Sequence, residues 1–277
     1  MPLLPHELER PISNADIINQ EIDYLLHTVL RSNFLVKEWN RLRRDLTANV
    51  HPFVRMAETV HKQIQEFSDQ KTFGMTEEIF ELSELAVLIN LLHSKNIVGL
   101  RARLNKLISP DYSLYYPARY EIQIGGILLK KGLNVRFIPE SKTKSPYILV
   151  SCDFGCCEIE CKHKEVSIDQ MDYVKSIYNN TQSARKQFTK KYPGIICIEI
   201  DKMHYDEFQQ ENQRLSDEIR RALRNSKSIS AIMLTSKILF QDSTDYVYRH
   251  RVVGYDNPYA RYPFPDWLRM NWINVME

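Results

Sequence analysis

The chain has 277 residues, of which 43% are hydrophobic and 26% charged, as is usual for a folded globular protein. Its formal net charge of +2 is too small to indicate nucleic-acid binding by itself, so any basic patch must be local. No run of about 18 apolar residues predicts a membrane span. The N-terminus also lacks the basic and apolar segments of a secretory signal, and we therefore expect a cytoplasmic protein with no membrane partner.

The five cysteines are expected to be reduced thiols. Their odd number and the expected cytoplasmic location argue against a disulfide framework. Four of them crowd into residues 152–161, but no CxxC pair is present, so we interpret them as small buried hydrophobic residues rather than zinc ligands.

Residues 1–110 are predicted to form an all-helical N-terminal region. Apolar residues recur at helical spacing over residues 14–26. A second helix is expected to open at Thr76, with acidic residues in its first turn, and to continue toward Ile108 with a break near Gly99. This region is a candidate for homo-oligomerisation or for docking a protein partner.

Residues 111–277 are predicted to form an α/β domain. A helix is expected from Pro117 to Lys131, with Gly132 as its C-terminal cap. Strands are expected next, at residues 133–138, 147–151 and 156–162, with a short hairpin turn between the last two.

The second half of this domain alternates helices and strands. Ser167 and Gln170 resemble a capping box that opens a long helix, which Pro193-Gly194 ends. The remaining expected elements are a strand at 194–200, a helix at 207–224 and strands at 229–235 and 246–253, followed by an irregular segment at 257–268. This order predicts a mixed central sheet flanked by helices.

The third strand carries charges on one face. Because side chains alternate along a strand, one face is apolar and the other is charged: the first holds Cys157, Ile159 and Cys161, and the second holds Glu158, Glu160 and Lys162. A Glu-x-Lys tripeptide is common, and its ordinary interpretation is a solvent-facing salt bridge on an edge strand. Its chemical interpretation is phosphodiester hydrolysis, in which the carboxylate binds a hard cation and the lysine stabilises negative charge.

The context of this tripeptide resembles the PD-(D/E)xK, or restriction-endonuclease-like, nuclease superfamily. The resemblance covers about 85 residues and lies in residues 119–138, Ser145–Ser151 and Glu158–Lys164. In that family a helical glutamate precedes a strand, Pro-Asp opens the next strand, and Glu-x-Lys lies on the third. The resemblance implies a restriction-endonuclease-like core.

The same resemblance implies a set of functional residues. Glu121 would be the helical carboxylate, Glu160 the metal ligand and Lys162 the catalytic lysine, with Gln187 matching a glutamine of the next helix. The implied cofactor is Mg²⁺ or Mn²⁺, and the implied partner is nucleic acid, with DNA preferred. Lys164, Arg185 and Lys186 are candidates for phosphate contacts, although solvated surface charge explains them equally well.

The sequence departs from the family at one metal position. Tyr147 follows Pro146 where the family has aspartate, and a tight hairpin would place it opposite Glu160. A phenol is a poor Mg²⁺ ligand at neutral pH. Asp153 is a candidate ligand only if the turn is wider or the register slips, because in a tight hairpin it lies about 20 Å from Glu160. The alternative is therefore a catalytically degenerate relative that binds nucleic acid or a protein without cleavage.

Overall fold

The computed structural model describes residues 20–22, 24–69, 76–139, 146–163, 173–200, 212–242 and 245–273. The chain divides into two compact units. The first comprises Met1–Asn96 and Arg103–Arg119, and the second comprises Ile97–Ala102 and Tyr120–Glu277.

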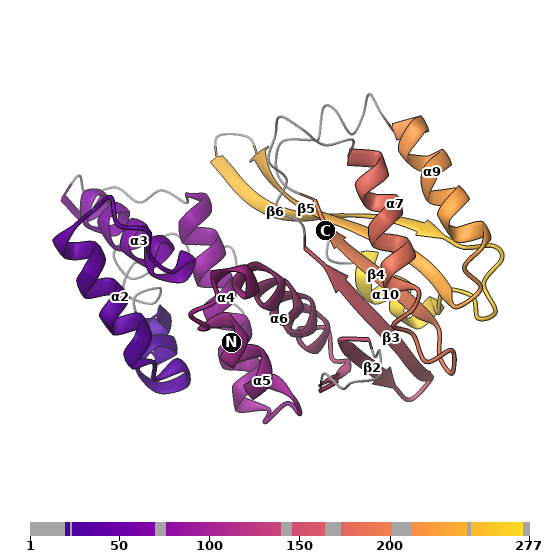
Figure 1. The fold of residues 1–277 in the computed structure, drawn as a ribbon, viewed down its shortest axis with the longest axis horizontal. Coiled ribbons are helices and arrows are strands. Elements are labelled where there is room, and N and C mark those ends of the chain that lie inside the picture. The colour runs from indigo at the N-terminus through magenta and orange to yellow at the C-terminus, as the bar shows by residue number, and fades with distance from the viewer. Residues whose placement is uncertain are drawn as a thin grey trace. The chain divides into compact units, whose positions relative to one another are not determined.

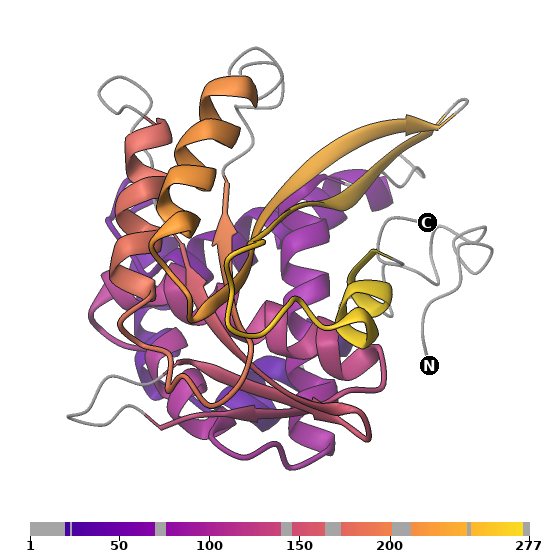
Figure 2. The same ribbon diagram turned by 90° about the vertical axis from the view of Figure 1, so that its right-hand side faces the viewer.

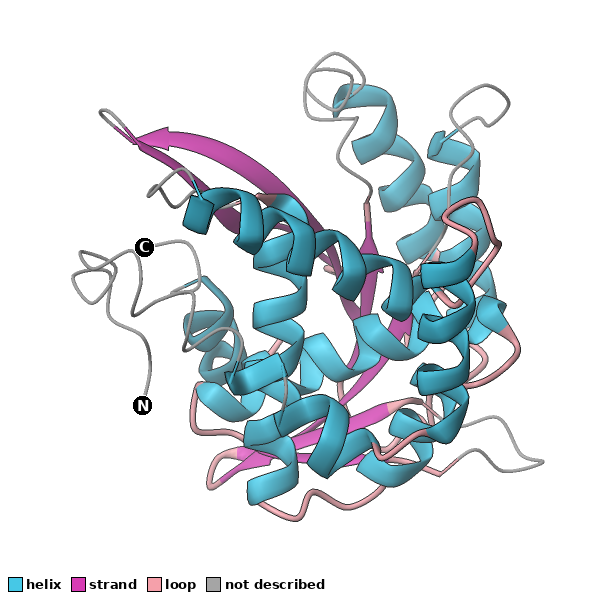
Figure 3. Cartoon of the chain, turned by 90° about the vertical axis from the view of Figure 1, so that its left-hand side faces the viewer, coloured by secondary structure: helices cyan, strands magenta, loops and turns pink. Residues whose placement is uncertain are grey.

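The first unit is helical, as predicted for the N-terminal region (Figure 3). Its helix α3 packs against both α2 and α4. Ser32 and Thr76 cap α2 and α4 by accepting hydrogen bonds from the Leu35 and Ile79 amides. The helices up to the start of the α/β unit are η2 (Leu25–Leu30), α2 (Asn33–Arg44), α3 (Pro52–Asp69), α4 (Glu77–Ser94), α5 (Leu100–Leu107) and η3 (Tyr112–Leu114).

The second unit is built on a six-stranded sheet in the order β1-β2-β3-β4-β5-β6 (Figure 1). The strands β1 to β3 are antiparallel, β3 to β5 are parallel, and β5 and β6 form a long antiparallel hairpin (Figure 2). The prediction of an α/β fold with a mixed sheet flanked by helices is confirmed. The elements are α6 (Tyr115–Lys130), β1 (Asn134–Phe137), β2 (Ile148–Cys152), β3 (Gly155–Lys162), α7 (Tyr173–Ala184), β4 (Gly194–Glu199), α9 (Asn212–Arg224), β5 (Ile229–Asp242), β6 (Asp245–Asp256) and α10 (Asp266–Ile273).

Helices cover both faces of this sheet. One face packs against α7 and α9, which lie side by side (Figure 1), through the alternate residues Ile196 and Ile198 of β4 and Ile232 of β5. The other face packs against α6, which approaches β1 closely because Gly125 lies beneath the Phe137 ring. A Cβ at Gly125 would come within 2.6 Å of that ring.

Several boundaries differ from the sequence expectations. The helix α6 starts at Tyr115, before Pro117, because Asp111 accepts a hydrogen bond from the Ser113 amide and caps the short helix that leads into it. The strand β5 extends to Asp242, since pairing with β6 continues along its whole length. The helix α10 begins inside the segment expected to be irregular. No helix in the described ranges is both long and apolar enough to span a bilayer.

Candidate functional site

The β2–β3 hairpin has the register predicted from its short turn. Ser151 pairs with Cys156, and β2 ends at Ile148 opposite Ile159. The same register continued by one residue places Tyr147 opposite Glu160, and the Tyr147 amide donates to the Ile159 carbonyl at 3.1 Å. The last residues of β3, from Glu160 on, therefore lie beyond the end of β2.

Glu160 and Lys162 are brought together at this end of β3. The Lys162 Nζ lies 2.7 Å from Glu160 Oε1, and the side-chain exposed fractions are 18% and 0%. The Lys162 Nζ also lies 5.6 Å from the centroid of the Tyr147 ring, within range of a cation–π contact. The carboxylate is thus fully buried, while the lysine reaches the surface. This arrangement differs from the solvent-facing salt bridge that the tripeptide alone suggests.

Glu158 has a structural role on the same face of β3. Its carboxylate accepts hydrogen bonds from the amide of Thr189, at 2.8 Å, and from the hydroxyl of Thr189. These bonds satisfy a buried charge and hold the segment that follows α7 against the strand.

Glu121 is buried on α6 and shares the neighbourhood of Cys161 with Glu160. Burial raises the pKa of the Cys161 thiol well above its usual value. A hydrogen bond with Cys197 and the nearby charges of Glu121 and Glu160 raise it further. Two buried carboxylates thus act on one thiol, although strand alternation directs Glu160 away from the face that α6 covers.

The two carboxylates fit a magnesium ion in its usual mode of binding. Mg²⁺ takes oxygen ligands and commonly uses one or two protein carboxylates, with water and phosphate oxygens completing its shell. Within the described ranges, no group of three or more His, Cys, Asp and Glu side chains gathers in a metal-binding arrangement. Any ion here would therefore depend on substrate oxygens.

The other predicted site residues lie apart from this pair or outside the described residues. Asp153 is exposed in the two-residue turn at the hairpin tip, and about seven residues of strand separate it from Glu160, which excludes a shared ion. Gln187 and Arg185 are half-buried and Lys186 is exposed, all in the turn after α7. Lys164 falls outside the described residues.

Sequence reasoning missed Glu199 at the end of β4. Its Oε2 lies 2.5 Å from Nδ1 of His163, the residue that follows Lys162. The available signal was the one used for Glu160, a charged residue in an otherwise apolar strand.

Comparisons with known proteins identify no family. No family model and no curated protein matches the chain. Among solved structures, the chain is similar to that of Pyrococcus furiosus SfsA in complex with Ca²⁺, with 15% identity and a TM-score of 0.24. The match covers 46% of this chain and 60% of that one, which is less than two thirds of its length. A TM-score this low does not establish a shared fold.

Proposed function

We propose that this protein is a metal-dependent nuclease of the PD-(D/E)xK type that hydrolyses phosphodiester bonds in DNA. The observation that carries the proposal is the contact of 2.7 Å between the Lys162 ammonium and the fully buried Glu160 carboxylate. A buried charged pair costs desolvation energy, so its position at the free end of β3 needs a reason beyond stability. Binding an ion and a phosphate supplies that reason.

Each residue has a distinct role in the proposed reaction. Glu160 and Glu121 would hold Mg²⁺, which when bound polarises the phosphate and lowers the pKa of the attacking water. Lys162 places a positive charge where the phosphorus gains negative charge. The water oxygen bonds to phosphorus, one P–O bond breaks, and the proton released by the water is passed to the leaving oxygen. Arg185 and Lys186 are the proposed backbone contacts.

A second candidate function is supported by Tyr147. Its ring lies against the Lys162 ammonium, at the position where the family has a carboxylate ligand. A protein with this arrangement would bind nucleic acid without cutting it. Replacement of one ligand by a phenol weakens metal binding without removing the positive charge that attracts phosphate.

A cleavage assay on the full chain tests both candidates. Plasmid and single-stranded DNA are incubated with Mg²⁺, with Mn²⁺ or with EDTA, and DNA binding is measured in parallel by fluorescence anisotropy. Glu160→Gln and Lys162→Met are compared with Glu218→Gln and Lys227→Met, which alter the same residue types on α9 and just after it. Circular dichroism verifies that each variant is folded.

We expect cleavage that requires a divalent ion and falls at least about 100-fold in the two site variants only. Wild-type rates in both site variants would reject the assignment. Binding without cleavage would favour the second candidate. In that case Tyr147→Asp should create ion-dependent cleavage, while Tyr147→Phe should not.

A further inference from the structure

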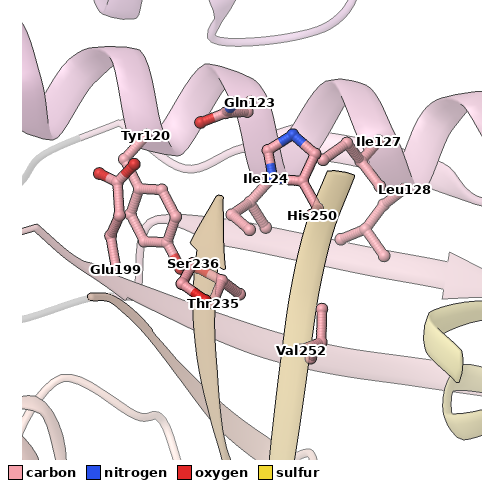
Figure 4. A pocket seen from close by; sticks show the side chains of 10 residues that line it. All are labelled: Tyr120, Gln123, Ile124, Ile127, Leu128, Glu199, Thr235, Ser236, His250 and Val252. Carbon is pink, nitrogen blue, oxygen red and sulfur yellow. Dashed lines mark hydrogen bonds between the residues drawn. The ribbon is translucent and has the colours of Figure 1, made fainter. Parts of the chain in front are cut away.

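A second polar site lies on the other face of the sheet, beneath α6. A pocket of about 450 Å³, including the space at its open mouth, lies between this helix and the strands β4, β5 and β6 (Figure 4). Glu199 and Tyr120 lie toward one end of the pocket, and Ile127 and Leu128 toward the other (Figure 4). The pocket thus combines a charged end with apolar walls.

The polar end is a row of side chains across three parallel strands. The register pairs Cys161 with Cys197 on β3 and β4, and Glu199 with Thr235 on β4 and β5. Two residues beyond Cys161, His163 is therefore level with Glu199, as their contact of 2.5 Å confirms. The preceding row on this face is apolar or thiol-bearing, so the polarity is confined to the carboxyl ends of the strands.

The row is held in place by fixed partners. The Thr235 hydroxyl shares a hydrogen bond of 2.7 Å with the buried Tyr120 hydroxyl, and His163 orients Glu199. Carboxyl ends of parallel strands are where open α/β sheets bind ligands. A preorganised polar row beside an apolar wall is the usual form of a small-molecule site.

The chemistry of the lining favours a nucleobase. A base has flat apolar faces, which suit the walls made by Ile124, Ile127 and Val252. Its edge carries both donors and acceptors. The amino group of adenine or cytosine donates to a carboxylate such as Glu199, and the adjacent ring nitrogen accepts from an amide such as Gln123. An alkyl amine would need only acceptors.

The pocket adjoins the proposed nuclease site. Lys162 and His163 are consecutive residues, and they point to opposite faces at the end of β3. A nucleotide with its phosphate beside Lys162 therefore lies within reach of the rim formed by His163 and Glu199.

We propose that this pocket binds a nucleobase that carries an exocyclic amino group, with Glu199 accepting from that group. The assignment rests on the proposed nuclease function for the source of the base, a nucleotide of the bound strand. Nuclease activity and base binding reside in different residues, so each can fail alone.

The test measures binding by the full chain in EDTA, so that no strand is cut. Adenosine is compared with inosine, which lacks the amino group, by saturation-transfer NMR. Thymine oligomers that contain one adenosine or one inosine are compared by fluorescence anisotropy. The variants are Glu199→Gln, which weakens the acceptor, and Val252→Phe and Ile127→Phe, which fill the pocket from different elements. Glu218→Gln is the matched control.

We expect adenosine to bind about ten-fold more tightly than inosine, both free and within a strand. The preference should vanish in Glu199→Gln, binding of the free nucleoside should be lost in both filled variants, and the control should match wild type. Equal binding of adenosine and inosine, or wild-type nucleoside binding in both filled variants, would overturn the proposal. Discrimination between free nucleosides but not between strands would overturn the nucleotide source. Selective binding by a protein that never cleaves DNA would reject the nuclease function alone.

Discussion

Removal of the Lys162 ammonium is expected to destabilise the second unit strongly. The ammonium lies 2.7 Å from the Glu160 carboxylate. At an effective dielectric constant of about 20, the Coulomb attraction at that distance is about 6 kcal/mol. Desolvation of the lysine offsets part of this attraction, so Lys162→Met should cost about 3–5 kcal/mol, the usual loss when one partner of a buried pair is removed.

A double-mutant cycle separates the pair from the rest of the site. Glu160→Gln, Lys162→Met and the double variant are compared by hydrogen exchange of the β4 amides, which reports the opening of the second unit by itself. The double variant removes both charges, so no carboxylate stays buried without its counter-charge. We expect a coupling free energy of about 2–3 kcal/mol, with the double variant more stable than the sum of the single losses implies.

A coupling free energy near zero would refute this reasoning. It would mean that water screens the two charges as it does at an exposed surface, where such pairs contribute little. The cost of burying Glu160 would then be small, and the pair would no longer call for a functional explanation.

Two further predictions concern stability. Burial lowers the pKa of His51 from 6.5 to about 4, partly offset by Glu38, so the unfolded chain binds this proton more readily. Stability is therefore retained above pH 6.5 and falls by about 3 kcal/mol toward pH 4, and His51→Asn should flatten that part of the measured pH profile. Gly99 and Gly132 both have positive φ, but a Cβ would come within 2.1 Å of the Phe137 carbonyl oxygen at Gly99 and meet nothing at Gly132. Gly132→Ala should thus cost about 1 kcal/mol and Gly99→Ala at least about 3 kcal/mol in urea unfolding, and equal losses would contradict the packing.

Local periodicity accounts for what the sequence predicted well. The alternation along residues 156–162 assigned each side chain of β3 to a face, and the two-residue turn fixed the hairpin register within a few residues of chain. Thr76 was identified as a helix start because a cap acts on residues directly after it. These features depend on neighbours in sequence, and a single chain displays them fully.

Register between strands that are distant in sequence leaves no such local signal. The row of His163, Glu199 and Thr235 exists because β3, β4 and β5 are parallel and pair at fixed offsets. Helical segments separate these strands, and nothing along the chain specifies which residues become level. The extension of β5 to Asp242 was likewise invisible, since it depends on pairing with β6.

The end of β3 explains how one strand serves two sites. Consecutive residues of a strand point to opposite faces about 3.3 Å apart along it. Where a strand is covered on both faces, such a pair is usually apolar, yet β3 ends in Lys162 and His163, each held by a carboxylate. The Lys162 carboxylate partner lies on its own strand, whereas the His163 partner comes from β4. The two contacts can therefore be changed independently, and a nucleotide at this edge would be held at its phosphate and at its base by residues adjacent in the chain.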